Sequence, residues 1–137
     1  MKALIDTNII IDNFACRDEY GDSLEILNLC ENGELEGVVS TVTIMDAMYI
    51  LRKHMDFTEA RNATLKLIQI VDVVPVLKSD INTALTSDFS DFEDAVQASC
   101  ASRVKTDYIV TRNVKDFRNS IVPSILPGDM LKLLQIF

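Results

Sequence analysis

Short apolar runs alternate along the chain with longer segments of helical periodicity. The apolar runs predict strands at 2–5, 36–40, 71–77 and 107–111. The periodic segments predict helices at 8–14, 20–32, 43–54, 57–70, 79–86, 91–104 and 127–134. Strands that alternate with helices are typical of a parallel sheet covered on both faces. The pattern therefore predicts an α/β fold, with Gly33 ending one helix and Pro75 marking an edge strand or a strand end.

The length of the chain and its few glycines and prolines indicate one domain. The 137 residues include four glycines and three prolines, and the chain contains no repeat, low-complexity segment or linker. A chain of this size can bury a core without covalent staples. We therefore expect a single domain over 1–137.

The bulk composition is that of a soluble globular protein, with 48% hydrophobic and 25% charged residues. No apolar run approaches the roughly 20 residues that a membrane span needs, and the N-terminus lacks a signal-peptide pattern. We expect a cytoplasmic protein that does not enter a membrane. The net charge of −8 argues against nucleic-acid binding, unless the negative charge is concentrated where metal ions neutralise it.

Cysteine and histidine offer little chemistry here. Cys16, Cys30 and Cys100 are widely spaced, so we interpret them as buried or half-buried thiols rather than zinc or redox ligands. His54, the only histidine, follows an apolar helix and is interpreted as a capping or surface residue. A histidine-based triad or a histidine-rich metal site is therefore not expected.

Acidic residues gather where predicted strands pass into helices, which is where open parallel sheets bind their ligands. Asp6 ends the first strand, Asp46 lies one turn into the helix after the second, and Asp116 follows the fourth. Asp91, Glu93 and Asp94 crowd the first turn of the helix at 91–104. Each acid taken singly also suits helix capping, as in Ser90-x-x-Glu93, Thr43-x-x-Asp46 and Asn113-x-x-Asp116. We interpret Asp91 and Glu93 as capping or solvated residues.

The combination of these acids favours a metal site. Asp46 lies in an apolar run and is expected to be largely buried, and Asp6 lies between Leu4-Ile5 and the isoleucines at 9–11. Carboxylates that converge on one sheet edge repel one another unless a cation balances them. Oxygen ligands without histidine or cysteine select Mg²⁺ or Mn²⁺, and two such ions can promote phosphodiester displacement.

The order and spacing of these motifs resemble the PIN-domain family across residues 2 to about 134. The resemblance rests on Asp6-Thr7-Asn8, the acid in the helix at 43–54, Asp91-Phe92-Glu93-Asp94-Ala95, and Thr111-Arg112-Asn113-Val114-Lys115-Asp116-Phe117. The nearest kind is the small VapC-like toxin of toxin–antitoxin pairs. That family implies a three-layer α/β/α sandwich with a central parallel sheet of four or five strands. It also implies a Mg²⁺- or Mn²⁺-dependent ribonuclease that cuts RNA with metal-activated water.

The resemblance also assigns roles to individual residues. The catalytic acids are Asp6, Asp46, Asp94 and Asp116, of which Asp6, Asp94 and Asp116 hold metal. Asp46 stands where the family usually has Glu, and Asn113 stands where many members have a fourth Asp, with Asp116 as the possible replacement. Thr111 matches a hydroxyl that orients a site acid. The other supporting polar residues are Asn8, Asn113 and Asp91.

Partners and rival functions complete the expectations. Arg112 and Lys115 are the first candidates for RNA contact, with Arg52, Lys53 and Arg118 as second choices. The resemblance implies an antitoxin protein, and we expect a homodimer, although the apolar stretches 24–29 and 44–51 fit a core as well as an interface. The alternatives are a catalytically weak or inactive PIN-like module that binds RNA or protein, a phosphotransfer receiver and a plain interaction module. A receiver is disfavoured because no Asp ends the third predicted strand.

Overall fold

A computed structural model describes residues 1–15 and 20–135. The strands are β1 (Lys2–Ile5), β2 (Glu36–Ser40), β3 (Asp72–Val74), β4 (Tyr108–Val110) and β5 (Ser124–Ile125). The helices are α1 (Thr7–Phe14), α2 (Gly21–Glu31), α3 (Thr41–Leu51), α4 (Phe57–Ile70), α5 (Lys78–Leu85), α6 (Phe92–Arg103), the 3₁₀ helix η2 (Val114–Phe117) and α7 (Pro127–Gln135). This order confirms the alternation that the sequence predicts.

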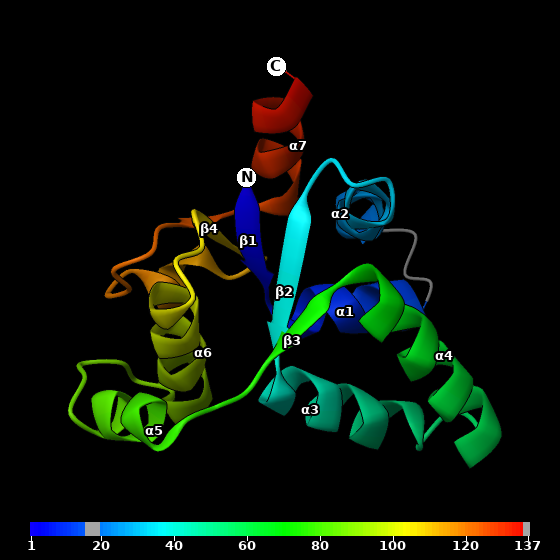
Figure 1. Cartoon of the computed structure of the whole chain (residues 1–137), viewed down its shortest axis with the longest axis horizontal. Helices are drawn as coiled ribbons and strands as arrows, with labels where there is room; N and C mark the ends of the chain where they lie inside the picture. The colour runs from blue at the N-terminus through cyan, green and yellow to red at the C-terminus, as the bar shows by residue number, and fades with distance from the viewer. Residues whose placement is uncertain (16–19, 136–137) are drawn as a thin grey trace.

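The strands form one parallel sheet in the order β3-β2-β1-β4-β5, so the predicted α/β class is correct. β1 lies at its centre, with Leu4 opposite Val38 on β2 and Ile109 on β4. Helices lie on both sides: α5 and α6 on one side, and α1, α2 and α7 on the other (Figure 1). The result is the three-layer arrangement that the family resemblance implies.

The two faces of the sheet bury different side chains because successive residues of a strand point in opposite directions. Ala3 and Ile5 pack with the isoleucines of α1, with α2 and with Met130 of α7. Leu4, between them, packs on the opposite face with α6 and Phe117. Strands that are buried on both faces read as unbroken apolar runs, which is the pattern seen at 2–5.

All five strands end at the same edge of the sheet, because they are parallel. That edge lies between α6 on one side and α1 and α3 on the other, in the lower centre of Figure 1. The chain enters α1 directly after β1 and enters α3 directly after β2. Residues at these two junctions are therefore held close together by the sheet itself.

Several details of the sequence interpretation change. β3 covers only residues 72–74 of the predicted 71–77, and it is an edge strand that stops before Pro75. β5 and η2 are absent from the predicted elements because each is too short to show periodicity. Gly33 ends α2 with a positive φ of 77°, as expected for a helix stop.

The cysteine and histidine interpretations are largely confirmed. Cys30 and Cys100 are buried free thiols, and Cys16 lies outside the described residues. His54 is exposed just after α3. Among the helices of the described residues, none combines the length and apolar character needed to cross a bilayer.

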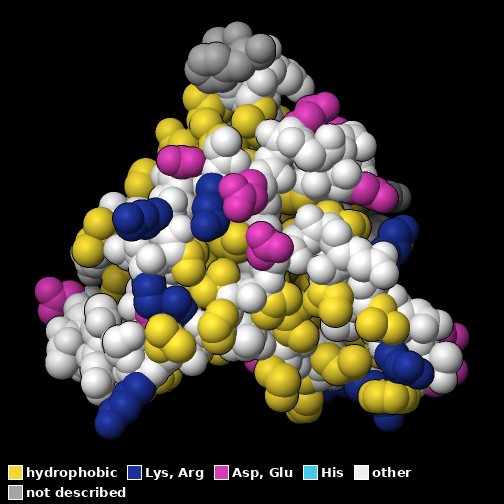
Figure 2. All heavy atoms as spheres, in the orientation of Figure 1, with side chains coloured by type: hydrophobic (Ala, Val, Ile, Leu, Met, Phe, Trp, Pro, Cys, Tyr) yellow, Lys and Arg dark blue, Asp and Glu magenta, His cyan; other side chains and the backbone are white. Residues whose placement is uncertain are grey.

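The surface carries scattered cations and a broad apolar area. In Figure 2, hydrophobic side chains are prominent over the lower part of the face, where Figure 1 shows β3, α3 and α4. Exposed apolar residues on these elements include Met45, Leu65, Ile68 and Val73. Lysine and arginine do not form a continuous basic patch on this face.

Candidate active site

Four acids from separate elements meet in one cleft at the carboxyl edge of the sheet. Asp6 follows β1, Asp46 lies on α3, Asp94 on α6 and Asp116 on η2, and all four line a cleft of about 530 Å³. The other lining residues are Thr7, Asn8, Ile11, Tyr49, Ile50, Lys53, Asp91, Glu93 and Asn113. The structure therefore brings together the acids that the sequence places at the junctions.

Asp6 is buried, with 6% of its surface exposed, and each of its carboxylate oxygens accepts a hydrogen bond. The Thr7 backbone N–H donates to Oδ1 at 2.8 Å, and the Thr111 hydroxyl donates to Oδ2 at 2.8 Å. Thr111 is itself fully buried and accepts from the Asn113 N–H at 3.0 Å. These donors explain how a carboxylate can lie between two apolar runs.

Burial and neighbouring groups shift the pKa of Asp6 in opposite directions. Burial raises the pKa of Asp6, and the nearby charge of Asp116 adds to the rise. Hydrogen bonds from Thr111 and Thr7 and the charge of Arg112 oppose it, but the net pKa lies above its usual value. Asp6 is thus a desolvated carboxylate that a cation would stabilise.

Arg112, which the sequence analysis expects to contact RNA, pairs with a buried acid of α1, and its contact with RNA stays a prediction. Its guanidinium pairs with both oxygens of Asp12, with Nε 2.8 Å from Oδ2, and lies 3.9 Å from the Tyr20 ring centroid. Asp12 is fully buried, so this pairing satisfies its charge inside the fold. Arg112 is not among the residues that line the cleft, and neither is the exposed Lys115.

Asp91 and Asp94 share the start of α6. Asp91 is the N-cap, and its Oδ1 accepts from the Asp94 N–H at 2.9 Å, so its predicted capping role is confirmed. Burial, followed by the negative charges of Asp91, Asp6 and Asp116, raises the pKa of Asp94 to about 7. Asp94 and Asp6 therefore interact across the cleft, although they are far apart in sequence.

Asp46 and Glu93 form a pair that the sequence does not reveal. Asp46 is only half-buried, so the expectation of a largely buried side chain is wrong; its neighbours Met45 and Tyr49 are 71% and 67% exposed. Glu93 lines the cleft as well as lying in the first turn of α6. A hydrogen bond with Asp46, together with burial and the charges of Asp46 and two nearby acids, raises the pKa of Glu93 to about 8.

The predicted capping boxes are not the ones observed. Ser40 caps α3 by accepting from the Thr43 N–H at 3.3 Å, so the box proposed for Thr43 and Asp46 is wrong. Asp91, not Ser90, caps α6. Asp46 is consequently left to face the cleft, since it has no part in that cap.

A buried polar network lies beneath the acids and connects three elements. The hydroxyls of Thr7 and Thr43 lie 2.8 Å apart, and the Gln97 amide nitrogen donates to Thr43 at 3.0 Å and to Thr7 at 3.4 Å. Gln97 is 1% exposed, and its Oε1 has no hydrogen-bond partner among the described residues. Each member is adjacent to an acid or one turn from one, so the network holds the acid-bearing elements together.

Among the described residues, Lys53 is the one lysine or arginine that lines the cleft. The sequence analysis gave it as a second choice for RNA contact. Lys53 lies in the turn just after Leu51, where α3 ends, and lines the same cleft as Asp46. Tyr49, between them, lines the cleft too, although no motif marks it. Helical spacing from Asp46 is the signal that identifies Tyr49, whereas the position of Lys53, beyond the helix, follows only from the fold.

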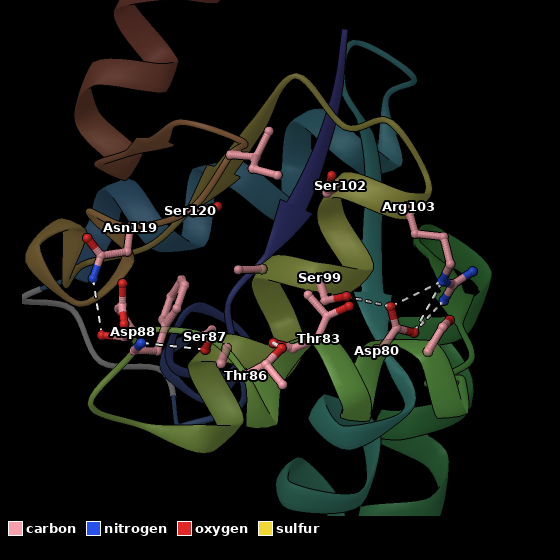
Figure 3. A pocket seen from close by; sticks show the side chains of 15 residues that line it. Asp80, Thr83, Thr86, Ser87, Asp88, Ser99, Ser102, Arg103, Asn119 and Ser120 are labelled. Carbon is pink, nitrogen blue, oxygen red and sulfur yellow. Dashed lines mark hydrogen bonds and ion pairs between the residues drawn. The ribbon is translucent and has the colours of Figure 1, made fainter.

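A second cavity, of about 740 Å³, lies on another side of α6 (Figure 3). Its wall contains Asp80 of α5, which is 1% exposed and accepts from Ser99 at 2.8 Å and from Arg103 Nε at 3.1 Å. These bonds join α5 to α6, and the hydroxyls of Thr83, Ser87 and Ser102 also face this region. The Asp80–Arg103 ion pair is satisfied within the fold, so we assign it a structural role.

The donor set of the acidic cleft fits an oxygen-preferring divalent cation. Within residues 1–15 and 20–135, no three acidic, histidine or cysteine side chains already converge on one point as a complete ligand cage. Mg²⁺ does not require such a cage, because it keeps several waters and commonly binds one or two carboxylates. Burial and the negative charges of neighbouring acids raise the pKa of Asp94, so a bound cation would stabilise its carboxylate. Asp6 and Asp94, whose charges interact across the cleft, are the two acids that would hold such an ion.

Solved structures with similar folds include chains from toxin–antitoxin complexes. The chain is 14% identical to VapBC2 from Rickettsia felis bound to a promoter DNA fragment, covering 92% of this chain and 98% of that one, with a TM-score of 0.69. It is 22% identical to a toxin–antitoxin complex from Klebsiella pneumoniae, covering 91% and 97%, with a TM-score of 0.70. For VapBC-1 from nontypeable Haemophilus influenzae the identity is 17%, the coverage 93% and 99%, and the TM-score 0.69.

Sequence comparison gives the family. No curated protein matches the chain. The family model described as PIN domain matches residues 2–115, which include β1 to β4 and Asp6, Asp46 and Asp94. With this match and the fold described above, the chain belongs to the PIN-domain family.

Proposed function

We propose that this chain is a divalent-metal-dependent ribonuclease and the toxin of a toxin–antitoxin pair. PIN domains are typically metal-dependent nucleases. The observation that carries the proposal is the meeting of Asp6, Asp46, Asp94 and Asp116 in one cleft. Toxin–antitoxin complexes among the structural neighbours support the physiological context.

Different residues of the cleft have different roles in the proposed reaction. Asp6 and Asp94 hold the cation, and Asp116 of η2 adds negative charge that acts on both of them. When bound, a Mg²⁺ or Mn²⁺ ion supplies an activated water and neutralises charge on the phosphate. Thr111 and the Thr7 N–H keep the Asp6 carboxylate in one orientation, and Asn8 and Asn113 line the same cleft. Lys53 provides the positive charge that a phosphate needs to approach.

Cleavage of varied RNAs with Mg²⁺ or Mn²⁺ tests this proposal. We expect the unaltered chain to cut RNA and EDTA to stop it. Asp6→Asn and Asp94→Asn should each lower the rate at least 100-fold, whereas Asp72→Asn, an exposed acid on β3, should not. Equal rates for all four proteins would remove the proposed site.

A binding module without cleavage is the second candidate. It is favoured by the absence of a ready-made carboxylate cage among the described residues. In that case the protein would bind RNA with the same affinity with and without metal, and none of the metal ions tested would produce cleavage. Metal-dependent cleavage that is lost in Asp94→Asn would exclude this candidate.

We also propose a partner site for the antitoxin. An apolar cavity of about 430 Å³ is lined by Ile11, Phe14, Ile50, Leu51 and Met55, among others, and lies between α1 and α3. Ile11 and Ile50 also line the acidic cleft, so a partner helix in this cavity would reach the acids. Coexpression with the protein of the neighbouring reading frame, followed by Ile50→Lys, tests this assignment. Loss of the complex supports it, and an unchanged complex contradicts it.

Two expectations remain predictions. The stretch 24–29 contributes Ile26 and Leu27 to the core, whereas 44–51 exposes Met45 and Tyr49, so of these two stretches 44–51 is the one that fits the expected homodimer. Sedimentation analysis of the purified chain tests that expectation. The cytoplasmic location is a prediction from the sequence.

A further inference from the structure

The largest of the cavities described above has no part in the proposed reaction. It has a volume of about 740 Å³, which is within the range of small-molecule sites, and it is bounded by α5, α6 and the segment after η2 (Figure 3). Asp6, Asp46, Asp94 and Asp116 do not line it. A ligand held there would therefore leave the acidic cleft open.

The two helices present short side chains to this cavity. A helix face that packs against a neighbouring helix usually carries large apolar residues. Here each helix contributes residues that are spaced as a single face, and most of them are small or carry a hydroxyl. They are Ser79 and Thr83 on α5, and Ala95, Ala98, Ser99 and Ser102 on α6.

Several hydroxyls of the wall are not used by the fold. Ser99 donates to Asp80, but the side chains of Thr83 and Ser102 make no hydrogen bond with another described residue. The Ser120 Oγ is buried and has no partner among the described residues either. Because a buried hydroxyl without a partner is costly, the wall has hydrogen-bonding capacity that a ligand would satisfy.

The charges of the wall disfavour an anionic ligand. Arg103 is the one lysine or arginine among the described residues that line the cavity, and its guanidinium pairs with Asp80 and donates to the Pro75 carbonyl. The exposed Asp88 adds a negative charge. Phosphates and carboxylates bind where charged donors are available, so we expect an uncharged ligand.

We infer that this cavity binds a small uncharged ligand whose ring carries neighbouring hydroxyls, with a nucleoside as the best fit. A hydroxyl both donates and accepts, so Thr83 of α5 and Ser102 of α6 can each pair with a ring hydroxyl. Phe89 and the two alanines of α6 supply apolar surface for a flat base. A free sugar shares the hydroxyls but lacks the base. The inference does not depend on the proposed ribonuclease function.

Calorimetric titration of the full chain in EDTA, with four probes, tests the chemistry of the ligand. We expect adenosine to bind with a Kd on the order of 0.1 mM. Loss of one hydroxyl in 2′-deoxyadenosine should weaken binding about 3- to 10-fold. AMP should bind roughly tenfold more weakly or worse, because the wall offers its phosphate no free cation. Weaker binding of methyl ribofuranoside than of adenosine assigns the site to nucleosides, and equal binding assigns it to free sugars.

Two variants locate the site, and a third is the matched control. Thr83→Val removes an exposed hydroxyl and should weaken adenosine binding about 3- to 10-fold, whereas Ser102→Leu fills the cavity and should abolish binding. Thr58 is an exposed threonine of α4 whose side chain is also unpaired, and it does not line the cavity. Thr58→Val should bind adenosine like the unaltered chain. Circular dichroism checks that each variant is folded.

Three results would overturn the inference. The first is that neither adenosine nor methyl ribofuranoside binds at millimolar concentration. The second is that AMP binds as tightly as adenosine. The third is that Thr83→Val and Ser102→Leu, both folded, bind adenosine no more weakly than Thr58→Val does, which would place the nucleoside elsewhere on the protein.

Discussion

At the scale of single residues, the carboxylates of the cleft differ in how they are supported. Asp6 is buried and accepts two hydrogen bonds, whereas Asp94 is half-buried and lies near other acids. A supported carboxylate keeps its orientation, and a crowded one is destabilised by its own charge. These differences lead to separate predictions for Thr111 and Asp94.

Thr111→Val should weaken metal binding without unfolding the protein. The substitution keeps the shape of the side chain but removes the hydroxyl that donates to Asp6 Oδ2 at 2.8 Å. Because this hydrogen bond lowers the pKa of Asp6, its loss raises that pKa further. Loss of an outer hydrogen bond to a metal ligand commonly costs 10- to 100-fold in affinity, so we expect about tenfold by titration calorimetry at pH 8.

The control for this variant is Thr106→Val. Thr106 is also buried, and its hydroxyl donates to the Ala101 carbonyl at 3.0 Å, away from the cleft. It should lose a similar amount of stability but no metal affinity. Equal metal affinities for the two variants would show that Thr111 does not support Asp6.

Asp94→Asn should stabilise the metal-free protein at alkaline pH. The pKa of Asp94 is raised to about 7, above its value in an unfolded chain, so its contribution to stability is complete below about pH 4 and is lost as the pH rises through 7. Asn avoids this loss. After allowance for solvent screening, we expect a gain on the order of 1–2 kcal/mol at pH 8 and almost none at pH 4.

Thermal unfolding with EDTA at the two pH values measures the effect. Asp72→Asn, which alters an exposed acid on β3 outside the cleft, should show no such difference between pH 4 and pH 8. If Asp94→Asn gives the same change in unfolding free energy at both pH values, the cost of ionising a buried and crowded Asp94 is not the cause.

At the scale of elements, the acids owe their positions to a shared polar network. Gln97 of α6 donates to Thr43 of α3 and Thr7 of α1, and these elements carry Asp94, Asp46 and the residue after Asp6. Gln97→Met keeps the volume but removes these bonds, along with a buried Oε1 that has no partner among the described residues. We expect unchanged or higher stability, because the unpaired oxygen is lost, but metal affinity about tenfold lower.

Lower stability with unchanged metal affinity would contradict this role for Gln97. A variant that unfolds more easily but binds Mn²⁺ as tightly as the unaltered chain would make Gln97 a packing residue. Ser99→Ala serves as the control, since Ser99 lies on the same helix but bonds to Asp80. It should leave metal affinity unchanged.

Most elements could be predicted from sequence, but side-chain direction could not. The apolar runs placed β1 and β2 at their observed bounds because both faces of those strands are buried. Arg112 was expected to contact RNA because it flanks the end of β4, but its pairing with Asp12, 100 residues away in sequence, could not be predicted. Glu93 was expected to be a capping or solvated residue from its spacing after Ser90, and its pairing with Asp46 could not be predicted because Asp46 lies on another helix. Spacing along one helix is readable from sequence, whereas contacts between elements require the fold.

The ion pair that joins α5 and α6 should stabilise the protein at neutral pH and lose this effect in acid. Burial raises the pKa of Asp80, but hydrogen bonds from Leu77, Arg103 and Ser99 outweigh it and hold the pKa below its usual value. A lowered pKa contributes stability that is complete above the unfolded pKa of about 3.9 and is lost as the pH falls through the folded value. Arg103→Gln should cost about 2–4 kcal/mol at pH 7 and much less at pH 2, measured by urea unfolding. An equal cost at both pH values would contradict the ion-pair explanation.

At the scale of the whole molecule, the negative charge is concentrated in the acidic cleft. Six carboxylates line one cleft, and they contribute much of the repulsion in a chain with a net charge of −8. A divalent ion that binds the folded state alone would relieve that repulsion and stabilise the whole domain. Metal, stability and RNA affinity should therefore change together.

Metal binding should raise the melting temperature and release protons near neutral pH. At a hundred times Kd, a bound ion stabilises the folded state by about 2.7 kcal/mol, or roughly 5–10 °C for a domain of this size. Because the pKa of Asp94 is about 7 and that of Glu93 about 8, part of the cleft is protonated at pH 7 and must lose its protons to bind the ion. Calorimetry in two buffers of different ionisation enthalpy should show proton release at pH 7 that disappears by pH 9. Asp94→Asn should lose most of the thermal shift, and a shift that survives this substitution would place the ion away from Asp94.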